Sequence, residues 1–121
     1  MNTGVETIIE KVRTSLKPLD IFKALIFGSF ANDAIQPESD LDLLVVLNKK
    51  TVSQDYQERL ANKLLVRNAL SEINQEIPID LLVYTKAEFE ILDNNRNAFF
   101  NEILTKGKIL FTNSISEQEI P

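Results

Sequence analysis

Two of the most apolar stretches of the chain, 41–47 and 79–84, carry aspartate at their starts. Both stretches have the length of a strand and are rich in Leu, Ile and Val, which favours β-structure. Aspartate is disfavoured in strands, yet Asp40 and Asp42 open the first stretch and Asp80 opens the second. Any fold for this chain must therefore bring carboxylates to the starts of two apolar strands.

The first half of the chain alternates helical and strand patterns. Apolar residues at three- and four-residue steps predict an amphipathic helix over 5–16, and the apolar run 24–27 predicts a strand that ends at Gly28. A capping box at 51–54 predicts the start of a long helix that continues to about Glu76. We expect the apolar face of this helix to consist of Leu60, Ala61, Leu64, Leu65, Ala69 and Ile73.

The second half continues the alternation after the strand at 79–84. A capping box at 85–88 begins a helix, which we expect 93–95 to interrupt. The apolar seam of the last helix is predicted to comprise Phe99, Phe100, Ile103 and Leu104. Gly107 ends that helix, Lys106 suits its negative dipole end, and 109–111 predicts an edge strand.

This order of elements predicts an α/β or α+β fold with a single sheet flanked by helices. The 121 residues suffice for one ordinary domain. We assign 1–112 to that domain and 113–121, which is polar, to a flexible C-terminal tail.

Composition excludes several kinds of chemistry. The chain has no histidine and no cysteine, which rules out Ser-His-Asp triads, histidine-ligated zinc, thiolate metal sites and disulfides. The formal charge is 13 − 18 = −5 with scattered basic residues, so we expect no direct binding of nucleic acid. No apolar run approaches the roughly 20 residues of a membrane span, and the N-terminus lacks the pattern of a secretory signal. We therefore expect a cytoplasmic protein with no membrane association.

The aspartates are the strongest candidates for chemistry. Side chains alternate along a strand, so Asp40 and Asp42 project to one face with Cα atoms about 6.6 Å apart. At that distance two carboxylates repel each other by roughly 2.5 kcal/mol at an effective dielectric constant near 20. Exposed strand-capping aspartates are the alternative, but three such residues together favour a cation site. If the strand of Asp80 lies beside that of Asp42, the three carboxylates converge and suit two Mg²⁺ ions.

A second candidate feature precedes the aspartates. Gly28-Ser29 follows a predicted strand and stands before a segment that could open a short helix. Glycine allows the backbone to approach a ligand closely, and free N–H groups with the Ser29 hydroxyl could bind a phosphate. Such a pair is more often a simple turn, and it becomes informative here because the aspartates follow ten residues later.

The combined pattern resembles the signature of the DNA polymerase beta-like nucleotidyltransferase superfamily. Its elements are Gly28-Ser29, ten intervening residues, Asp40-Leu41-Asp42 in an apolar strand, and Asp80 on a later strand. The short length and the run 99–111 resemble the minimal nucleotidyltransferase branch, whose members often act as antitoxins beside HEPN toxins. The resemblance implies a nucleotidyltransferase fold with a mixed sheet.

The resemblance also implies roles for individual residues. Asp40, Asp42 and Asp80 would be the catalytic, metal-binding carboxylates for two Mg²⁺ ions, with Asp80 also helping to activate the attacking hydroxyl. Gly28 and Ser29 would hold the β- and γ-phosphates of ATP. Asn32 is a further nucleotide-binding candidate. Asn32 and Asp33 depart from the Arg and Gly usual in this loop, which removes a bidentate phosphate donor.

Three functions are compatible with these features. The first is Mg²⁺-dependent transfer of AMP from ATP to a tyrosine of a partner HEPN toxin, which would make the chain an antitoxin. The second is a binding module of weak or no activity that sequesters a partner, since the charge of −5 suits a basic, RNA-handling protein. The third is a nucleotidyltransferase for small molecules, as in aminoglycoside modification. A homo-oligomer is compatible with all three.

Overall fold

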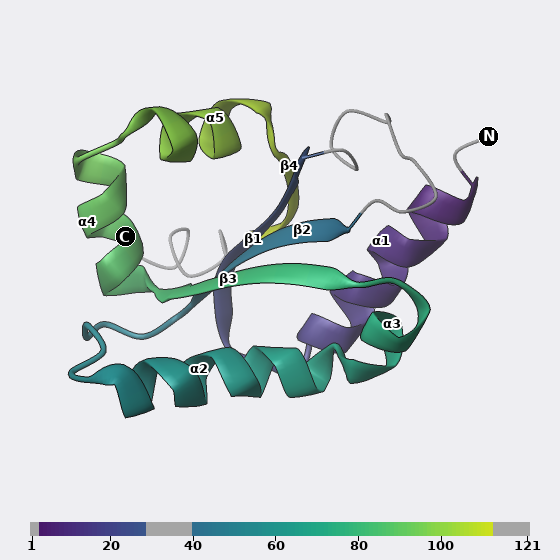
Figure 1. Ribbon diagram of the computed structural model, residues 1–121, viewed down its shortest axis with the longest axis horizontal. Helices are drawn as coiled ribbons and strands as arrows, with labels where there is room; N and C mark the ends of the chain where they lie inside the picture. The colour runs from purple at the N-terminus through teal and green to yellow at the C-terminus, as the bar shows by residue number, and fades with distance from the viewer. Residues whose placement is uncertain (1–2, 29–39, 113–121) are drawn as a thin grey trace, which may run out of the picture.

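The computed structural model describes residues 3–28 and 40–112, with side chains described from residue 6 onward. Helices and strands alternate along this part of the chain, as Figure 1 shows. In order they are α1 (Thr3–Leu16), β1 (Ile21–Phe27), β2 (Leu41–Leu47), α2 (Tyr56–Ala69), α3 (Ser71–Glu76), β3 (Ile79–Thr85), α4 (Lys86–Asn94), α5 (Ala98–Lys106) and β4 (Lys108–Thr112). The predicted tail 113–121 lies outside the described residues.

The four strands form one sheet in the order β3-β2-β1-β4. β2 and β3 are parallel, whereas β1 is antiparallel to both β2 and β4. The predicted single mixed sheet flanked by helices is therefore confirmed. The predicted edge strand at 109–111 is also present, as the central part of β4.

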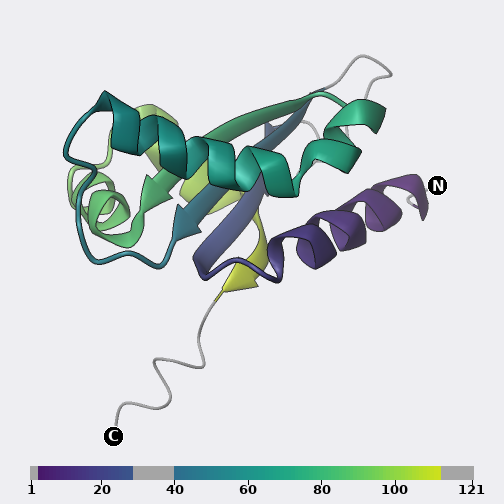
Figure 2. The ribbon, with the colours of Figure 1, turned by 90° about the horizontal axis from the view of Figure 1, so that it is seen from below.

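Helices cover both faces of the sheet and divide the core into two layers (Figures 1 and 2). Residues of α1, α2 and α3 pack on one face, and residues of α4 and α5 pack on the other. The alternation along β2 shows the division: Leu43 and Val45 belong to the first layer, and Leu44 and Val46 belong to the second. All four side chains are fully buried, so β2 is the centre of the molecule. No helix in the described part is long and apolar enough to span a membrane.

The predicted signals around α4 and α5 are confirmed in detail. Thr85 and Glu88 form the capping box of α4, with both reciprocal hydrogen bonds present. α4 then ends at Asn94, where an interruption was predicted. Gly107 is the C-cap of α5, in an extended conformation that leads directly into β4.

The prediction for the start and length of the 51–76 helix was wrong. The N-cap of α2 is Asp55, whose side chain accepts a hydrogen bond from the backbone N–H of Glu58, so the capping box expected at 51–54 does not form. The helical run is also divided: Leu70 separates α2 from α3. The later start reflects local hydrogen bonding, because aspartate is among the strongest N-cap residues.

The predicted apolar face of α2 was wrong for most of its members. The helix buries Asn62 and Val66, while Leu60, Leu64 and Leu65 are exposed. Of the predicted set only Ile73, on α3, is fully buried. Asn62 is buried because it is fully partnered, accepting from Lys49 Nζ at 2.6 Å and donating to Ser53 Oγ at 3.2 Å. The side of α2 that faces the core is therefore the one held by the contacts of Asn62 with Lys49 and Ser53. It carries fewer leucines than the side predicted from the sequence.

Candidate functional site

The two predicted acidic strand starts meet at one edge of the sheet. Asp42 on β2 is the register partner of Asp80 on parallel β3, and on its other side it pairs with Phe27 of β1. By strand alternation, Asp42 faces the same side as Leu44 and Val46, which is the side covered by α4 and α5. Asp40 stands immediately before β2 and is exposed. The prediction that the carboxylates converge required the strand of Asp80 to lie beside the strand of Asp42, and the pairing of β3 with β2 meets this condition.

The electrostatics of this edge centre on Asp42. Its side chain is half-buried, and loss of hydration is the largest influence that raises its pKa above the ordinary value. The negative charges of Asp80 and Asp40 raise the pKa further, as does a hydrogen bond shared with Asp80. Asp42 therefore interacts with both other predicted carboxylates, and their negative charges disfavour its own charged form.

The donor chemistry fits a hard divalent cation that binds together with a nucleotide. Within residues 3–28 and 40–112, no three acidic side chains form a preassembled metal-binding group. Mg²⁺, however, commonly takes only one or two carboxylates and completes its shell with water and substrate phosphates. Asp42, which is half-buried, and its exposed register partner Asp80 suit that mode of binding. Asp40 is placed to join them at the exposed end of the strand.

Gly28 closes the same edge from β1. Its φ of +73° lies in the left-handed region that glycine tolerates and other residues rarely adopt. A Cβ at this position would also collide with Oδ2 of Asp42. The predicted requirement for glycine thus has two causes, the turn itself and the close approach of a carboxylate. Ser29 and Asn32, the other predicted nucleotide-binding residues, lie outside the described residues.

A cavity of about 260 Å³ adjoins the carboxylate edge. Its walls combine the end of β1, Asp42 and one side of α5, and the lining residues are Phe27, Gly28, Asp42, Phe99, Glu102, Ile103 and Lys106. A larger cavity of about 600 Å³ lies between α1 and α3 and contains none of the predicted site residues. We place the candidate site in the smaller cavity, because the aspartate with the raised pKa and the glycine with a positive φ both line it.

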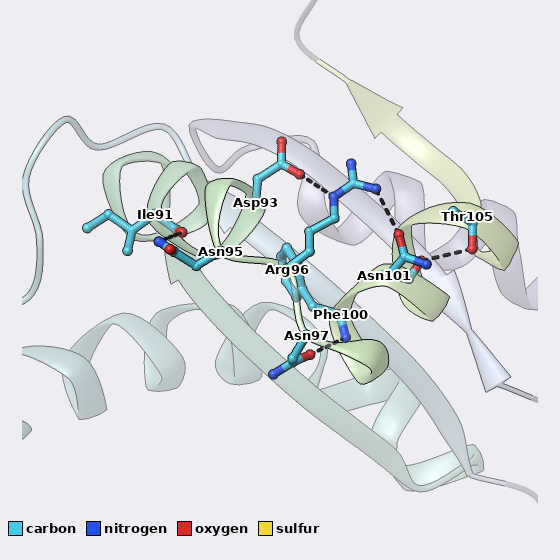
Figure 3. Close-up of polar contacts among 8 residues, drawn as sticks. All are labelled: Ile91, Asp93, Asn95, Arg96, Asn97, Phe100, Asn101 and Thr105. Carbon is cyan, nitrogen blue, oxygen red and sulfur yellow. Dashed lines mark hydrogen bonds and ion pairs between the residues drawn. The ribbon is translucent and has the colours of Figure 1, made fainter.

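Contacts between α4 and α5 hold the helical wall of this cavity. The side chain of Asn97 caps α5 by accepting the N–H of Phe100 at 2.7 Å. Arg96 links the two helices: its Nε donates to Asp93 at 2.7 Å and its Nη1 donates to Asn101 at 3.1 Å (Figure 3). These contacts fix both the start and the direction of α5.

Sequence reasoning missed the contribution of α5 to the cavity. Phe99 was expected in the core seam of the last helix, but its side chain is 60% exposed and lines the cavity. Lys106 was expected only to interact with the helix dipole, yet it lines the same cavity as Asp42. The available signal was helical spacing, because Phe99, Glu102 and Lys106 fall on one side of the helix.

Comparison with known proteins agrees with this geometry. The family model described as polymerase beta, nucleotidyltransferase matches residues 6–116. No curated protein sequence matches the chain.

Several solved structures share the fold at low sequence identity. A toxin–antitoxin crystal structure with AMP-PNP aligns with a TM-score of 0.59 and 18% identity, covering 91% of this chain and 77% of the other. A mutant of the toxin–antitoxin MntA–HpeT gives 0.55 and 15% over the same shares. A proposed nucleotidyltransferase from Sulfolobus solfataricus gives 0.51 and 16%, covering 91% of this chain and 81% of that protein.

The structural matches establish the fold, and the family match extends over the strands, the acidic edge and the helical wall of the cavity. The chain belongs to the polymerase beta nucleotidyltransferase family.

Proposed function

We propose that this chain is a Mg²⁺-dependent nucleotidyltransferase that moves AMP from ATP to a hydroxyl group. The pairing of Asp42 with Asp80, beside a glycine that no larger residue can replace without a collision, carries the proposal. In the protein alone, the negative charge of Asp80 acts against the negative charge of Asp42. A bound cation would offset this repulsion by attracting both carboxylates. Family membership supports the same chemistry.

Each residue of the site then has a proposed role. Asp40, Asp42 and Asp80 would hold two Mg²⁺ ions, and such ions would supply stabilisation of the charge that develops on the transferred phosphate and the leaving group. Gly28 and Ser29 offer the β- and γ-phosphates a close approach to the backbone. Lys106, on the opposite wall of the cavity, adds the positive charge that the loop lacks because Asn32 and Asp33 stand in place of Arg and Gly.

The transfer step follows from this placement. The acceptor oxygen attacks the α-phosphorus, the bond from that phosphorus to the bridging oxygen breaks, and pyrophosphate leaves. Asp80 orients the acceptor hydroxyl, and the proton of that hydroxyl passes to a carboxylate of the site. Loss of hydration strengthens each of these charge interactions, since Asp42 is already half-buried.

For the acceptor we propose a tyrosine hydroxyl of a HEPN-type toxin, whose RNase activity the added AMP would silence. Support comes from the fold shared with proteins solved as toxin–antitoxin assemblies, one of them with AMP-PNP. A small-molecule acceptor is less well supported, because the described part of the chain offers only a 260 Å³ cavity at the carboxylates and no second domain to complete an acceptor pocket.

Radiolabel transfer tests the proposal. The purified chain, a HEPN partner, α-³²P-ATP and Mg²⁺ are expected to give labelled partner, and Asp42→Asn is expected to abolish labelling. Asp20→Asn is the matched control, because Asp20 is an exposed aspartate directly before β1, at the opposite end of that strand from Gly28. Absence of transfer with every nucleotide and divalent metal would contradict the proposal.

Sequestration of the partner is the second candidate, favoured by the exposed leucines of α2. The Asp40→Asn/Asp42→Asn double variant separates the two functions. Under the enzymatic proposal this variant no longer neutralises the toxin. Full neutralisation by the double variant would instead establish stoichiometric binding as the mechanism.

A further inference from the structure

The outward side of α2 carries an apolar surface that the fold does not cover. Leu60, Leu64 and Leu65 are 39%, 41% and 45% exposed, and Tyr56 is 71% exposed. Tyr56, Leu60 and Leu64 follow at four-residue steps and so form one continuous row along the helix. We call these four residues the α2 outer face. Apolar side chains gathered in this way on one helix usually mark an interaction site.

The inward contacts of α2 prevent the leucines from turning into the core. Asn62 is 5% exposed and is held by Lys49 and Ser53, while Val66 is completely buried. Turning the helix to bury Leu60 and Leu64 would break the hydrogen bonds of Asn62 with Lys49 and Ser53 and would carry Val66 out of the core. The outward position of the leucines is thus a stable property of the folded chain.

A row of positive charge borders the α2 outer face. Arg59, Lys63 and Arg67 follow one another at four-residue steps and form a second row along α2. In the sequence, Arg59 directly precedes Leu60 and Lys63 directly precedes Leu64. The ion pairs found among the described residues are Lys11–Glu76, Arg13–Glu10 and Arg96–Asp93, so none uses this row. Arg59 acts at a distance on Glu88, whose pKa it helps to lower. The chain as a whole has a net charge of −5, so this positively charged row differs from the rest of the molecule and favours an acidic partner.

We propose that the α2 outer face docks a helix of a protein partner, whose apolar stripe is bordered by aspartate or glutamate. Apolar contact with Leu60 and Leu64 would provide affinity, and the basic row would fix the orientation of the partner helix. The proposal rests on the exposure and charge of α2 and does not depend on nucleotidyl transfer.

Other occupants fit these observations less well. An anionic membrane is disfavoured by the net charge of −5. A second copy packed antiparallel across a two-fold axis would set the Arg59–Lys63–Arg67 row against its own symmetry mate, which places like charges together.

The location of α2 separates a docked partner from the cavity of the candidate site. The helix packs on the sheet face opposite to that of α5 (Figures 1 and 2), whose residues line the cavity at Asp42. A partner helix on α2 therefore leaves the cavity open. One partner could bind here and present another of its segments at the carboxylate edge.

Two synthetic helical peptides provide the probe. Each has about 18 residues and the same leucine stripe, but one peptide has glutamate at the bordering positions and the other has lysine. We expect the glutamate peptide to bind the full chain at least tenfold more tightly by fluorescence anisotropy. Amide shifts in ¹H–¹⁵N spectra are expected to concentrate on α2.

Variants on and off α2 give the proposal its controls. Leu60→Ser/Leu64→Ser is expected to weaken binding of the glutamate peptide at least tenfold, whereas Ile91→Ser changes an aliphatic residue that is 53% exposed on α4 and should have no effect. Lys63→Glu/Arg67→Glu should reverse the preference in favour of the lysine peptide. Lys17→Glu/Lys50→Glu, which makes the same charge change at exposed positions elsewhere, should leave the preference unchanged.

Several outcomes would overturn the proposal. Equal binding of both peptides, binding of neither, or shifts centred outside α2 would each contradict it. Self-association abolished by Leu60→Ser/Leu64→Ser would assign the face to a second copy, and leucine-dependent binding to phosphatidylserine vesicles would assign it to a membrane. Circular dichroism on each variant checks that the fold is retained. Loss of transfer in the labelling experiment would leave the peptide result unaffected, so the two proposals fail separately.

Discussion

The two ends of the β2–β3 pair use carboxylates in opposite ways. At the starts of the strands, Asp42 lies opposite Asp80, and its pKa is raised by burial and by the neighbouring negative charges. Just beyond the other end, Glu88 accepts hydrogen bonds from the backbone N–H groups of Ser53 at 2.7 Å and Thr85 at 2.9 Å.

Glu88 shows how the same kind of side chain can stabilise the fold. Burial is the largest single influence on its pKa and acts to raise it, but the hydrogen bonds from Thr85 and Ser53, with the charge of Arg59, outweigh burial and lower the pKa. Its charge is thus satisfied by the protein, whereas the charge of Asp42 is not. The comparison separates a carboxylate stabilised by hydrogen bonds of the protein from one that burial and neighbouring negative charges destabilise.

The largest expected effect is on catalysis at the Asp42 end. Asp42→Asn should lower transfer at least 1,000-fold, in the range found when a group that stabilises the transition state is removed. It should also stabilise the ligand-free protein by less than about 1 kcal/mol, or less than about 3–6 °C in a domain of this size, because a repulsion is lost. Differential scanning fluorimetry without metal checks the second effect. A lower melting temperature would show that Asp42 supports the fold.

At the opposite end, the expected effect is a loss of stability. The N–H groups of Ser53 and Thr85 each donate to one carboxylate oxygen of Glu88. In Glu88→Gln one of these N–H groups faces the side-chain NH₂ and loses its acceptor, which should lower the free energy of unfolding by about 1–3 kcal/mol. Urea unfolding measures this loss. Glu90→Gln, an exposed position on the same helix, should change the free energy of unfolding by less than about 0.5 kcal/mol. Equal effects at the two positions would remove the distinction between the two ends.

A smaller effect is expected at Lys106. Lys106→Met should raise the KM for MgATP about tenfold and leave kcat nearly unchanged, since a charge bound equally to substrate and transition state affects mainly binding. Lys106→Arg should restore most of the affinity. A fall in kcat with unchanged KM would assign Lys106 to the transfer step instead.

The dependence of stability on pH should differ in sign between the two ends. Glu88 has a folded-state pKa below its ordinary 4.5, so its contribution is present above that pH and is lost as the pH falls through the folded pKa. Asp42 has a folded-state pKa above its ordinary 3.8, so its unfavourable contribution is absent below that pH and grows as the pH rises.

Urea unfolding of both variants between about pH 3 and 7 tests this contrast. The stability gained by Asp42→Asn should shrink toward zero in acid, and so should the stability lost by Glu88→Gln. Asp42 is only half-buried, so solvent screening keeps its part below about 1 kcal/mol. Stability differences that do not vary with pH would contradict the assigned shifts.

Local sequence patterns were sufficient where the determining interactions are also local. Strand alternation placed Asp42 on the same side of β2 as Leu44 and Val46, and the Thr85–Glu88 box reads directly from a four-residue motif. The requirement for glycine at Gly28 was also predictable as a turn, although its contact with Asp42 depends on strand pairing.

Features set by distant contacts could not be predicted from local patterns. The rotation of α2 depends on Lys49 and Ser53, which lie outside the helix, so counting leucines gave the wrong buried face. Helical spacing puts Lys106 on the same side of α5 as Phe99 and Glu102, but the position of that side at the cavity of Asp42 depends on how α5 packs on the sheet. Tertiary contacts override amphipathic patterns in both cases.

Divalent cation binding tests most directly whether the Asp42 end is a site for a ligand. With Mn²⁺ or Mg²⁺ and a non-hydrolysable ATP analogue at tenfold excess over Kd, the wild-type protein should gain about 1.4 kcal/mol of stability. Asp42→Asn should gain none, while Glu88→Gln, destabilised from the start, should gain as much as the wild type. Equal stabilisation of wild type and Asp42→Asn, or stabilisation of neither, would contradict the assignment of these carboxylates to a metal–nucleotide site.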